Sequence, residues 1–236
     1  MNVAIAFFSS IVEEIPTRNF MAARGSVFLY VPNLIGYVRV ILGIVSFAYA
    51  FDNYKLAVVA YSASQLLDAL DGYAARALNQ SSMFGAVLDM VTDRVSSNIL
   101  LMILAVLYGK DKFLIFAGLA MLDYASHWFS MYASVYVGAT SHKAMTPSRP
   151  WLLRMYYGSK LLLFLCCVSQ EMTYLSLYVL QSAPVDGSQI DFACASFAQG
   201  ALLASGPLTI LKQIINVIQL TDASQMIVKK EKSKRS

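Results

Sequence analysis

The sequence predicts an all-α integral membrane protein with six transmembrane helices and a short N-terminal helix lying along the membrane surface. Hydrophobic residues make up 58% of the 236 residues. Charged residues make up only 14%, against about 25% in soluble domains. Polar turns divide the apolar sequence into six segments, each close to the roughly 20 residues that a membrane span needs. The small net charge of +4 does not predict nucleic-acid binding.

Composition divides the chain into three parts. Residues 1–28 form an N-terminal extension, residues 29–222 a six-helix membrane domain and residues 223–236 a basic tail. In the extension, residues 12–28 mix arginines with apolar side chains, which is typical of an interfacial helix. A flexible terminus is the alternative. The extension does not resemble a signal peptide, because its start lacks basic residues.

Each predicted span is bounded by a recognisable signal. Pro32 fits the first turn of a helix. Polar turns follow at residues 52–55, 79–82 and 108–112. The six predicted spans cover residues 31–51, 56–78, 83–107, 113–137, 154–180 and 192–220. No internal repeat is evident, which argues against an inverted-repeat transporter.

The distribution of lysine and arginine predicts the orientation in the membrane. Six spans put both termini on one side, together with the turn at 79–82 and the basic segment 138–153. Because positive residues favour the cytoplasm, we expect this side to be cytoplasmic. Lys232 and Lys234 match a K-x-K-x-x retrieval tail, which favours the endoplasmic reticulum, with the Golgi as a second location. A tail that binds anionic lipid is the alternative.

The second and third predicted spans carry four aspartates within apolar sequence: Asp68, Asp71, Asp89 and Asp93. Each costs about 2.5–3.5 kcal/mol near hydrocarbon on insertion scales. Counted from Gln80, Asp71 and Asp89 lie nine residues away, and the other two lie twelve and thirteen away. At 1.5 Å per residue, antiparallel helices then place the carboxylates at matching depths of about 14 and 19 Å. Spacings of three and four residues put each pair on one helix face.

This set of oxygen ligands, without histidine or cysteine, favours a hard cation, so the sequence predicts Mg²⁺ or Mn²⁺, as two ions. Arg76 and Arg94 are the nearest basic residues along the chain and are too few to pair with four acids. Arg76 can hold a phosphate near the headgroups. Asn33 and Arg39, in the first span, face either a nucleotide or a neighbouring helix. Cations beside a phosphate-binding arginine predict phosphoryl transfer.

A spaced motif runs through this region, D-x2-D-G-x2-A-R-x8-G-x3-D-x3-D. It is met by Asp68, Asp71, Gly72, Ala75, Arg76, Gly85, Asp89 and Asp93. The motif resembles the signature of the CDP-alcohol phosphotransferases. The segments V-P-N-L-I-G-Y-V-R, A-S-H-W, S-H-K and R-M-Y-Y resemble one branch of that family, the eukaryotic phosphatidylinositol synthases. The resemblance covers about residues 28–220.

The resemblance implies transfer of the phosphatidyl group from CDP-diacylglycerol to myo-inositol, with release of CMP, by a homodimer in the membrane. It implies that Asp68, Asp71 and Asp89 bind metal, and that Asp93 is the general base and can also touch a metal. The candidate contacts to CDP-diacylglycerol are Asn33, Gly72, Ala75, Arg76, Ser82 and Gly85. The two glycines among them leave room for a ligand or a neighbouring helix to approach the backbone.

The sequence identifies the residues that would bind the acceptor alcohol less clearly than those that would bind the CDP group. The candidates for inositol contact, for which positive-inside topology is the alternative explanation, are Ser141, His142, Lys143, Arg154 and Lys160. The motif describes only the CDP half, so the alternative function is a related transferase that uses glycerol phosphate, serine or choline. A cation-coupled transporter is the remote alternative, because acids inside a membrane also mark ion pathways.

Overall fold

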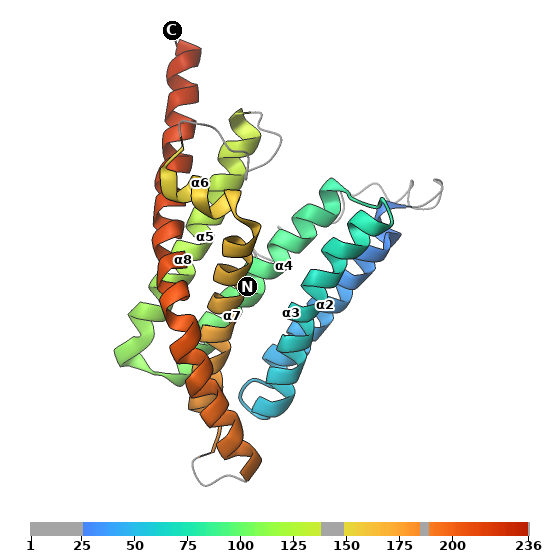
Figure 1. Ribbon diagram of the computed structural model, residues 1–236, viewed down its shortest axis with the longest axis vertical. Helices are drawn as coiled ribbons and strands as arrows, with labels where there is room; N and C mark the ends of the chain where they lie inside the picture. The colour runs from blue at the N-terminus through green and yellow to red at the C-terminus, as the bar shows by residue number, and fades with distance from the viewer. Residues whose placement is uncertain (1–25, 138–148, 185–188, 236) are drawn as a thin grey trace, which may run out of the picture.

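A computed structural model describes residues 26–137, 149–184 and 189–235 of the chain (Figure 1). All secondary structure within these three ranges is helical. In chain order the elements are η2 Val27–Leu29, α2 Val31–Ala48, α3 Tyr54–Ala77, α4 Met83–Leu107, α5 Lys110–Val137, α6 Trp151–Gly158, α7 Lys160–Ser182 and α8 Gln189–Arg235. The six long helices alternate in direction along the long axis (Figure 1).

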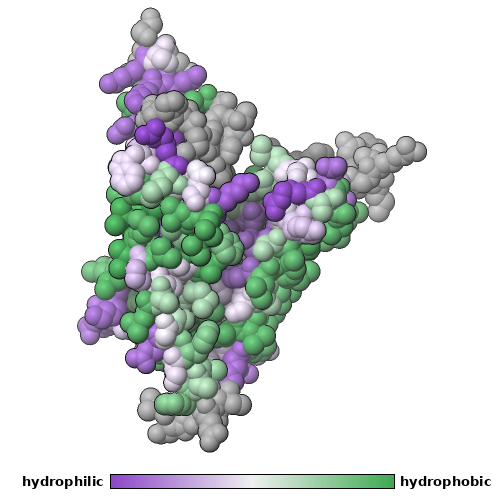
Figure 2. All heavy atoms as spheres, viewed as in Figure 1, coloured by the Kyte–Doolittle hydropathy of each residue, from purple (hydrophilic) through white to green (hydrophobic). Residues whose placement is uncertain are grey.

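The helices form two groups that α4 joins. Helices α2 and α3 pack along each other as an N-terminal arm, whereas α5, α7 and α8 pack together with the short α6 across one end (Figure 1). Helix α4 runs diagonally between the groups and contacts α2, α5 and α7. Hydrophilic side chains gather in the hollow between the two groups, near the end that holds the α3–α4 turn (Figure 2). The fold therefore places polar groups inside an otherwise apolar molecule.

Four of the described helices are long and apolar enough to cross a membrane: α2, α4, α7 and the part of α8 from Asp191 to Ser233. Large apolar side chains also face outward on other helices, such as Leu66 on α3 and Leu114 on α5, which are 72% and 79% exposed. Extensive outward apolar surface suits contact with lipid rather than water. The chain is thus an integral membrane protein. Helices α3 and α5 fall outside the four because they carry polar residues such as Asp71 and Asp123.

The larger of two apolar core clusters lies at the end of the molecule away from the α3–α4 turn. It is built from the C-terminal parts of α2, α4 and α7 and the N-terminal parts of α3, α5 and α8. Leu101, Leu104 and Tyr174 are each at most 1% exposed there. Packing of this kind fixes the helices at one end, so the opposite end is where the two groups can separate around polar side chains.

The predicted boundaries differ from the structure by more than three residues in two places. The fifth predicted span, from residue 154 to 180, is broken at Ser159, so that the short helix α6 precedes α7. Ser159 has extended backbone, with φ −104° and ψ 104°, and its side chain accepts a hydrogen bond from the backbone N–H of Leu162, which caps α7. Helix α8 continues to Arg235, well beyond the predicted end at residue 220. The predicted interfacial helix lies almost wholly outside the described residues, which include only the single turn η2.

A candidate metal and nucleotide site at the α2–α3–α4 junction

All four predicted aspartates surround one guanidinium group, that of Arg39 on α2. Its Nη1 contacts Asp71 Oδ2 at 2.7 Å and Asp89 Oδ1 at 2.8 Å. Its Nη2 contacts Asp68 Oδ1 at 2.7 Å and Asp93 Oδ1 at 2.5 Å. Each nitrogen thus bridges one acid from α3 and one from α4. These are the same pairs that the residue count from Gln80 placed at matching depths.

Local contacts hold the three helices in this register. The turn between α3 and α4 reverses through Asn79, whose φ of 52° lies in the left-handed region that asparagine tolerates. The side chain of Gln80 accepts a hydrogen bond from the backbone N–H of Val31 at 2.9 Å, which ties this turn to the start of α2. Ser82 caps α4 by accepting from the backbone N–H of Gly85 at 3.0 Å. The turn chemistry therefore sets the relative height of the acids.

Deeper in the arm, Ser64 holds α3 against α2 beside the acids. Its hydroxyl donates to the backbone carbonyl of Arg39 at 3.0 Å. Because Ser64 lies one helical turn before Asp68, this bond fixes the arginine level with the acids.

The basic residues nearest along the chain are not the main partners of the four acids, and the sequence did not identify the one that is. Arg76 lies exposed in the last turn of α3, and Arg94 forms its close ion pair with Asp123, reaching Asp93 only at 3.9 Å. Arg39 is the arginine that contacts the acids, and its side chain is 1% exposed. An arginine inside an apolar span is itself a signal, because such a residue normally pairs with acids. Its rotational position relative to α3 and α4, however, is not encoded in its spacing along α2.

The four acids remain unbalanced in charge, and two of them are well exposed. One guanidinium offsets a single negative charge, so three carboxylate charges have no matching cation in this cluster when all are ionised. The side chains of Asp68 and Asp89 are 40% and 46% exposed, so the cluster opens on one side. Ligand oxygens of Asp68, Asp71 and Asp89 lie within 4.8 Å of one another. This all-oxygen set fits a hard divalent cation.

A pocket of about 170 Å³ adjoins the acids between α2, α3 and α4. Asp71 and Asp89 line both the pocket and the acidic cluster. Five of the six predicted contacts to CDP-diacylglycerol line it: Asn33, Gly72, Ala75, Ser82 and Gly85. The sixth, Arg76, lies beside it, since its Nη1 is 3.5 Å from where a Cβ on Gly72 would be. A phosphate in this pocket would meet small side chains, backbone and one exposed arginine on one side, and the carboxylates of Asp71 and Asp89 on the other, so a cation is needed between the phosphate and these acids.

The two glycines in the pocket do different work. A Cβ on Gly85 would lie 2.6 Å from Asn33 Oδ1, closer than real contacts allow, so Gly85 permits the approach of α4 to α2. A Cβ on Gly72 would make only ordinary contact with Arg76, so nothing within the described protein requires glycine there. Asn33 is 1% exposed and donates from Nδ2 to the Val27 carbonyl at 2.5 Å, which anchors η2. Gly85 serves packing, whereas Gly72 keeps the pocket open.

A second group of polar side chains, the α4–α5 polar cluster, consists of Arg94, Asn98, Asp123 and His127. Asp123 is 1% exposed and accepts from Arg94 Nη1 at 3.0 Å and from Asn98 Nδ2 at 3.1 Å. His127 Nδ1 lies 2.9 Å from the Asp123 carbonyl oxygen. Here one acid meets one arginine, with an amide and an imidazole close by. Asp123 lies outside the spaced motif and is the only acid in its predicted span, so sequence spacing did not identify it.

Glu171 on α7 is another acid that sequence spacing did not mark. Its carboxylate accepts hydrogen bonds from the Tyr61 hydroxyl and from Ser97 Oγ, each at 2.6 Å. Ser97 also donates to the backbone carbonyl of Asp93. Glu171 therefore joins α3, α4 and α7 about one helical turn of α4 beyond Asp93.

Two of the five inositol candidates lie within the described residues, and neither contacts the acids. Ser141, His142 and Lys143 lie outside the described residues. Arg154 on α6 and Lys160 at the start of α7 are exposed, and neither forms an ion pair with the four aspartates. Both belong to elements at the end of the molecule that holds the α3–α4 turn (Figure 1).

Helix α6, which carries Arg154, is anchored through Tyr156. Its hydroxyl accepts from Lys212 Nζ at 2.9 Å. Burial raises the pKa of Tyr156 well above its usual value, so that this hydroxyl stays neutral.

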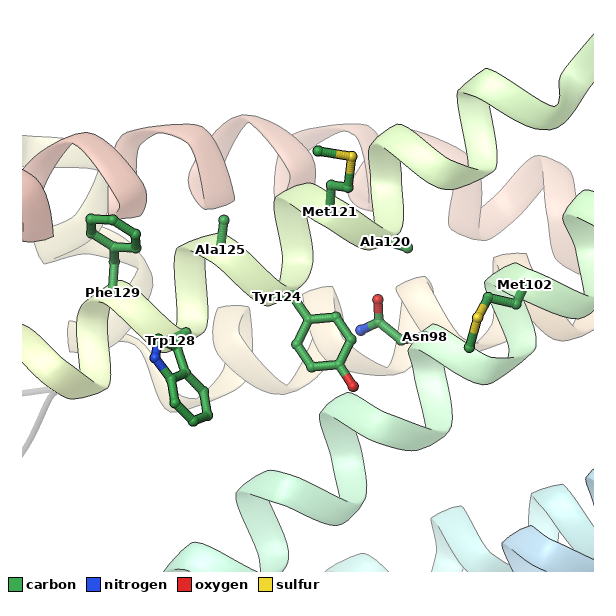
Figure 3. A pocket seen from close by; sticks show the side chains of 8 residues that line it. All are labelled: Asn98, Met102, Ala120, Met121, Tyr124, Ala125, Trp128 and Phe129. Atoms are coloured by element: carbon green, nitrogen blue, oxygen red, sulfur yellow. The ribbon is translucent and has the colours of Figure 1, made fainter. Parts of the chain in front are cut away.

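A larger groove, of about 510 Å³, lies between α4 and α5 and is lined mainly by apolar side chains (Figure 3). Met102, Tyr124 and Trp128 are among its walls, and Asn98 contributes an amide. It contains no charged residue. A groove of this character suits apolar groups and offers nothing that would bind a pyrophosphate, so the smaller pocket beside the acids is the better candidate for chemistry.

Comparisons with known proteins agree with the motif. The family model described as CDP-alcohol phosphatidyltransferase matches residues 29–222. The chain is 41% identical over 213 residues to the probable CDP-diacylglycerol–inositol 3-phosphatidyltransferase 2 of Arabidopsis thaliana, covering 86% of this chain and 91% of that protein. It is 43% identical over 202 residues to the CDP-diacylglycerol–inositol 3-phosphatidyltransferase of Homo sapiens, covering 85% and 92%. No solved structure gave a significant match.

Proposed function

Because the chain belongs to the CDP-alcohol phosphatidyltransferase family, we propose that it transfers the phosphatidyl group of CDP-diacylglycerol to myo-inositol, giving phosphatidylinositol and CMP. The observation that carries the proposal is that Asp71 and Asp89 belong both to the acidic cluster and to the small-residue pocket. A nucleotide pyrophosphate in that pocket lies directly beside the carboxylates. The names of the similar proteins supply inositol as the acceptor.

The pocket residues support a role in holding the CDP group. Gly72 and Ala75 lie on consecutive turns of α3. Their small side chains leave space in the pocket, so that a pyrophosphate can approach the helix backbone. Arg76, exposed beside them, offers a planar fork of donors that matches phosphate oxygens. The hydroxyl oxygen of Ser82 accepts the hydrogen bond that caps α4, and the hydroxyl proton remains available to donate to a ligand. These residues would bind and orient the donor substrate.

Asp93 is proposed as the general base. One of its oxygens accepts from Arg39, whereas Oδ2 lies 3.9 Å from Arg94 and is the atom available for a proton. As the inositol oxygen bonds to the phosphorus that carries diacylglycerol, its proton passes to Asp93. The bridging P–O bond breaks and its electron pair leaves with CMP. Arg94, held in place by Asp123, keeps the base oriented toward the cluster.

Asp68, Asp71 and Asp89 would hold the divalent cations, Mg²⁺ or Mn²⁺, in agreement with the close grouping of their oxygens. Bound there, the cations supply positive charge to the pyrophosphate oxygens and to the departing phosphate. The expectation of two ions rests on the set of four carboxylates without histidine or cysteine.

We propose six membrane spans, with α3 and α5 added to the four most apolar helices. Their 24 and 28 residues give about 36 and 42 Å of helix, enough to cross a hydrocarbon core of about 30 Å. The alternating directions in Figure 1 support this count. The end with the acids carries Arg76, Arg149 and the lysines of the C-terminal helix, which favours a cytoplasmic active site. Residence in the endoplasmic reticulum and homodimer formation remain predictions from the tail and the resemblance.

One assay tests the function: CMP release from CDP-diacylglycerol by the purified protein, with a panel of alcohols and with Mg²⁺ or Mn²⁺. Myo-inositol is expected to support release, and chelation with EDTA is expected to abolish it. Release with serine, choline or glycerol phosphate but not with inositol would instead assign the chain to a related transferase. Movement of cations across sealed vesicles without CMP release would support a transporter.

A further inference from the structure

Arg39 occupies the centre of the proposed cation site. Its two terminal nitrogens contact an oxygen of every one of the four aspartates, at 2.5–2.8 Å. Three of those aspartates are the ones whose oxygens group closely enough to hold an ion. The side chain of Arg39 is 1% exposed, whereas those of its partners are up to 46% exposed. The arginine thus fills the protein side of the cluster and leaves the acids accessible from the other side.

The guanidinium takes one oxygen of each of the four carboxylates, on the protein side of the cluster. A magnesium ion sits about 2.0–2.1 Å from each ligand oxygen. Nη1 already bridges one oxygen of Asp71 and one of Asp89, and Nη2 bridges one oxygen of Asp68 and one of Asp93. An ion bound between the oxygens of either pair would collide with a nitrogen, so while Arg39 stays in place only the second oxygen of each acid remains for a cation. Two cations and one guanidinium in the same place would also repel each other strongly, because buried charges are poorly screened.

The charges explain why such a group is useful before cations bind. Four clustered carboxylates repel one another, and the α3–α4 hairpin alone offers no cation between them. A planar, permanently charged fork can reach two acids with each terminal nitrogen, which a lysine ammonium cannot do in the same geometry. Arg39 therefore neutralises part of the charge and draws α2, α3 and α4 together in the cation-free protein.

We propose that Arg39 is an internal competitor of the divalent cations. It holds the aspartates in the cation-free state and gives up these contacts when cations bind, so that it sets how tightly cations bind and how much they stabilise the fold. This inference rests on the proposed role of the aspartates as ligands. By reciprocity, whatever Arg39 adds to the stability of the cation-free protein is subtracted from the affinity for the cation.

The test compares the purified full-length protein with its Arg39→Lys variant in detergent, with MnCl₂ as the only added ligand. Two quantities are measured: the Kd for Mn²⁺, from the loss of the free-ion electron paramagnetic resonance signal, and Tm with and without saturating Mn²⁺. We expect the variant to lose several degrees of Tm without Mn²⁺ and almost nothing with it. Its Kd should fall about ten-fold, a typical size for coupling between two sites.

Arg149→Lys is the matched control. Arg149 is buried and pairs with Asp222 through Nε at 3.3 Å, in the C-terminal group of helices rather than at the acidic cluster. Any loss of Tm in this variant should be the same with and without Mn²⁺, and its Kd should equal that of the unchanged protein. The control separates the general effect of replacing a buried arginine from competition at the cluster.

The possible outcomes are distinct. An equal loss of Tm in Arg39→Lys with and without Mn²⁺, together with an unchanged Kd, would overturn the competition while leaving the cation site intact. Failure of the unchanged protein to bind Mn²⁺ would overturn the proposed ligand role, and this inference with it. If Arg39→Lys is recovered only when purified in MnCl₂, that rescue supports the proposal. If Mn²⁺ does not improve a poor recovery, the arginine is structural and the proposal is wrong.

Discussion

The acidic cluster and the α4–α5 polar cluster are built from the same kinds of residues yet differ in charge balance. The acidic cluster sets four carboxylates against one guanidinium and is open on one side. The polar cluster sets Asp123 against Arg94, and Asp123 is 1% exposed. A balanced and closed set of charges holds helices together. An unbalanced and open set, in the same membrane protein, indicates a site whose missing charge comes from a ligand.

The two clusters should also respond differently, in the free energy of unfolding, to the loss of one charged side chain. Removing one partner from a closed pair leaves an uncompensated buried charge, which costs about 3–5 kcal/mol. Removing one acid from an overcrowded cluster relieves repulsion, so the fold should tolerate the change while the chemistry does not. The following variants test this contrast, from the largest expected effect to the smallest.

Asp93→Asn should have the largest effect, and on turnover alone. The amide cannot accept a proton from inositol, so kcat is expected to fall about 10³-fold, within the range for loss of a general base. The variant should fold and still bind CDP-diacylglycerol. Measurement of CMP release beside Tm in detergent checks both statements. Near-normal turnover would remove Asp93 as the base.

Asp123→Asn should show the reverse pattern. It removes the acid 3.0 Å from Arg94 Nη1 and leaves Arg94 only the longer contact of 3.9 Å with Asp93. We expect a loss of about 3–5 kcal/mol in the free energy of unfolding, seen as a lower Tm and a lower yield of folded protein. Asp93→Asn is the matched control, since it also replaces one aspartate near Arg94. Equal stability of the two variants would contradict the distinction between the clusters.

Gly72 and Gly85 test, within the pocket, the same contrast between residues that serve ligand binding and residues that serve packing. Gly72→Ala should leave Tm unchanged but raise KM for CDP-diacylglycerol about ten-fold, because its methyl group enters space reserved for the ligand. Gly85→Ala should lower Tm, because its Cβ collides with Asn33. The overpacking is expected to cost about 1–3 kcal/mol. A stable Gly85→Ala protein with unchanged KM would show that α4 can move away from α2 freely.

The smallest effect is expected at the exposed basic residues near the open end. Arg154→Gln and Lys160→Gln remove charges that form no ion pair with the acids. Exposed charges contribute at most about 1 kcal/mol, so KM for inositol should rise no more than about five-fold. Steady-state kinetics at varied inositol, with CDP-diacylglycerol saturating, measures this. A hundred-fold rise for either variant would make that residue a direct contact of the acceptor.

Sequence reasoning reached the relative depth of the acids because it depends on spacing within one hairpin, whereas the candidate pocket residues came from the family resemblance. Residue counts from Gln80 pair Asp71 with Asp89 and Asp68 with Asp93, and the same pairs share a nitrogen of Arg39 in the structure. The count works because two helices joined by a tight turn have little freedom to slide. The all-helical architecture followed in the same way from apolar segment length.

Features that depend on contacts between distant segments were not predictable in this way. The rotation of α2 that turns Arg39 toward the acids is decided by packing, including the bond from Ser64. The break at Ser159 was missed because apolar residues lie on both sides of the three-residue interruption Gly158-Ser159-Lys160. Glu171 lacks a neighbouring acid in sequence, and only the fold brings it to Tyr61 and Ser97.

The position of Arg39 before the four aspartates in the chain has a consequence for biosynthesis. Chains emerge and fold from the N-terminus, so α2 reaches the membrane before α3 and α4 do. Each acidic helix that enters the bilayer therefore finds its positive partner already there. Moving the arginine to a helix made later would leave the nascent hairpin with unpaired acids during insertion, even if the finished protein had the same contacts.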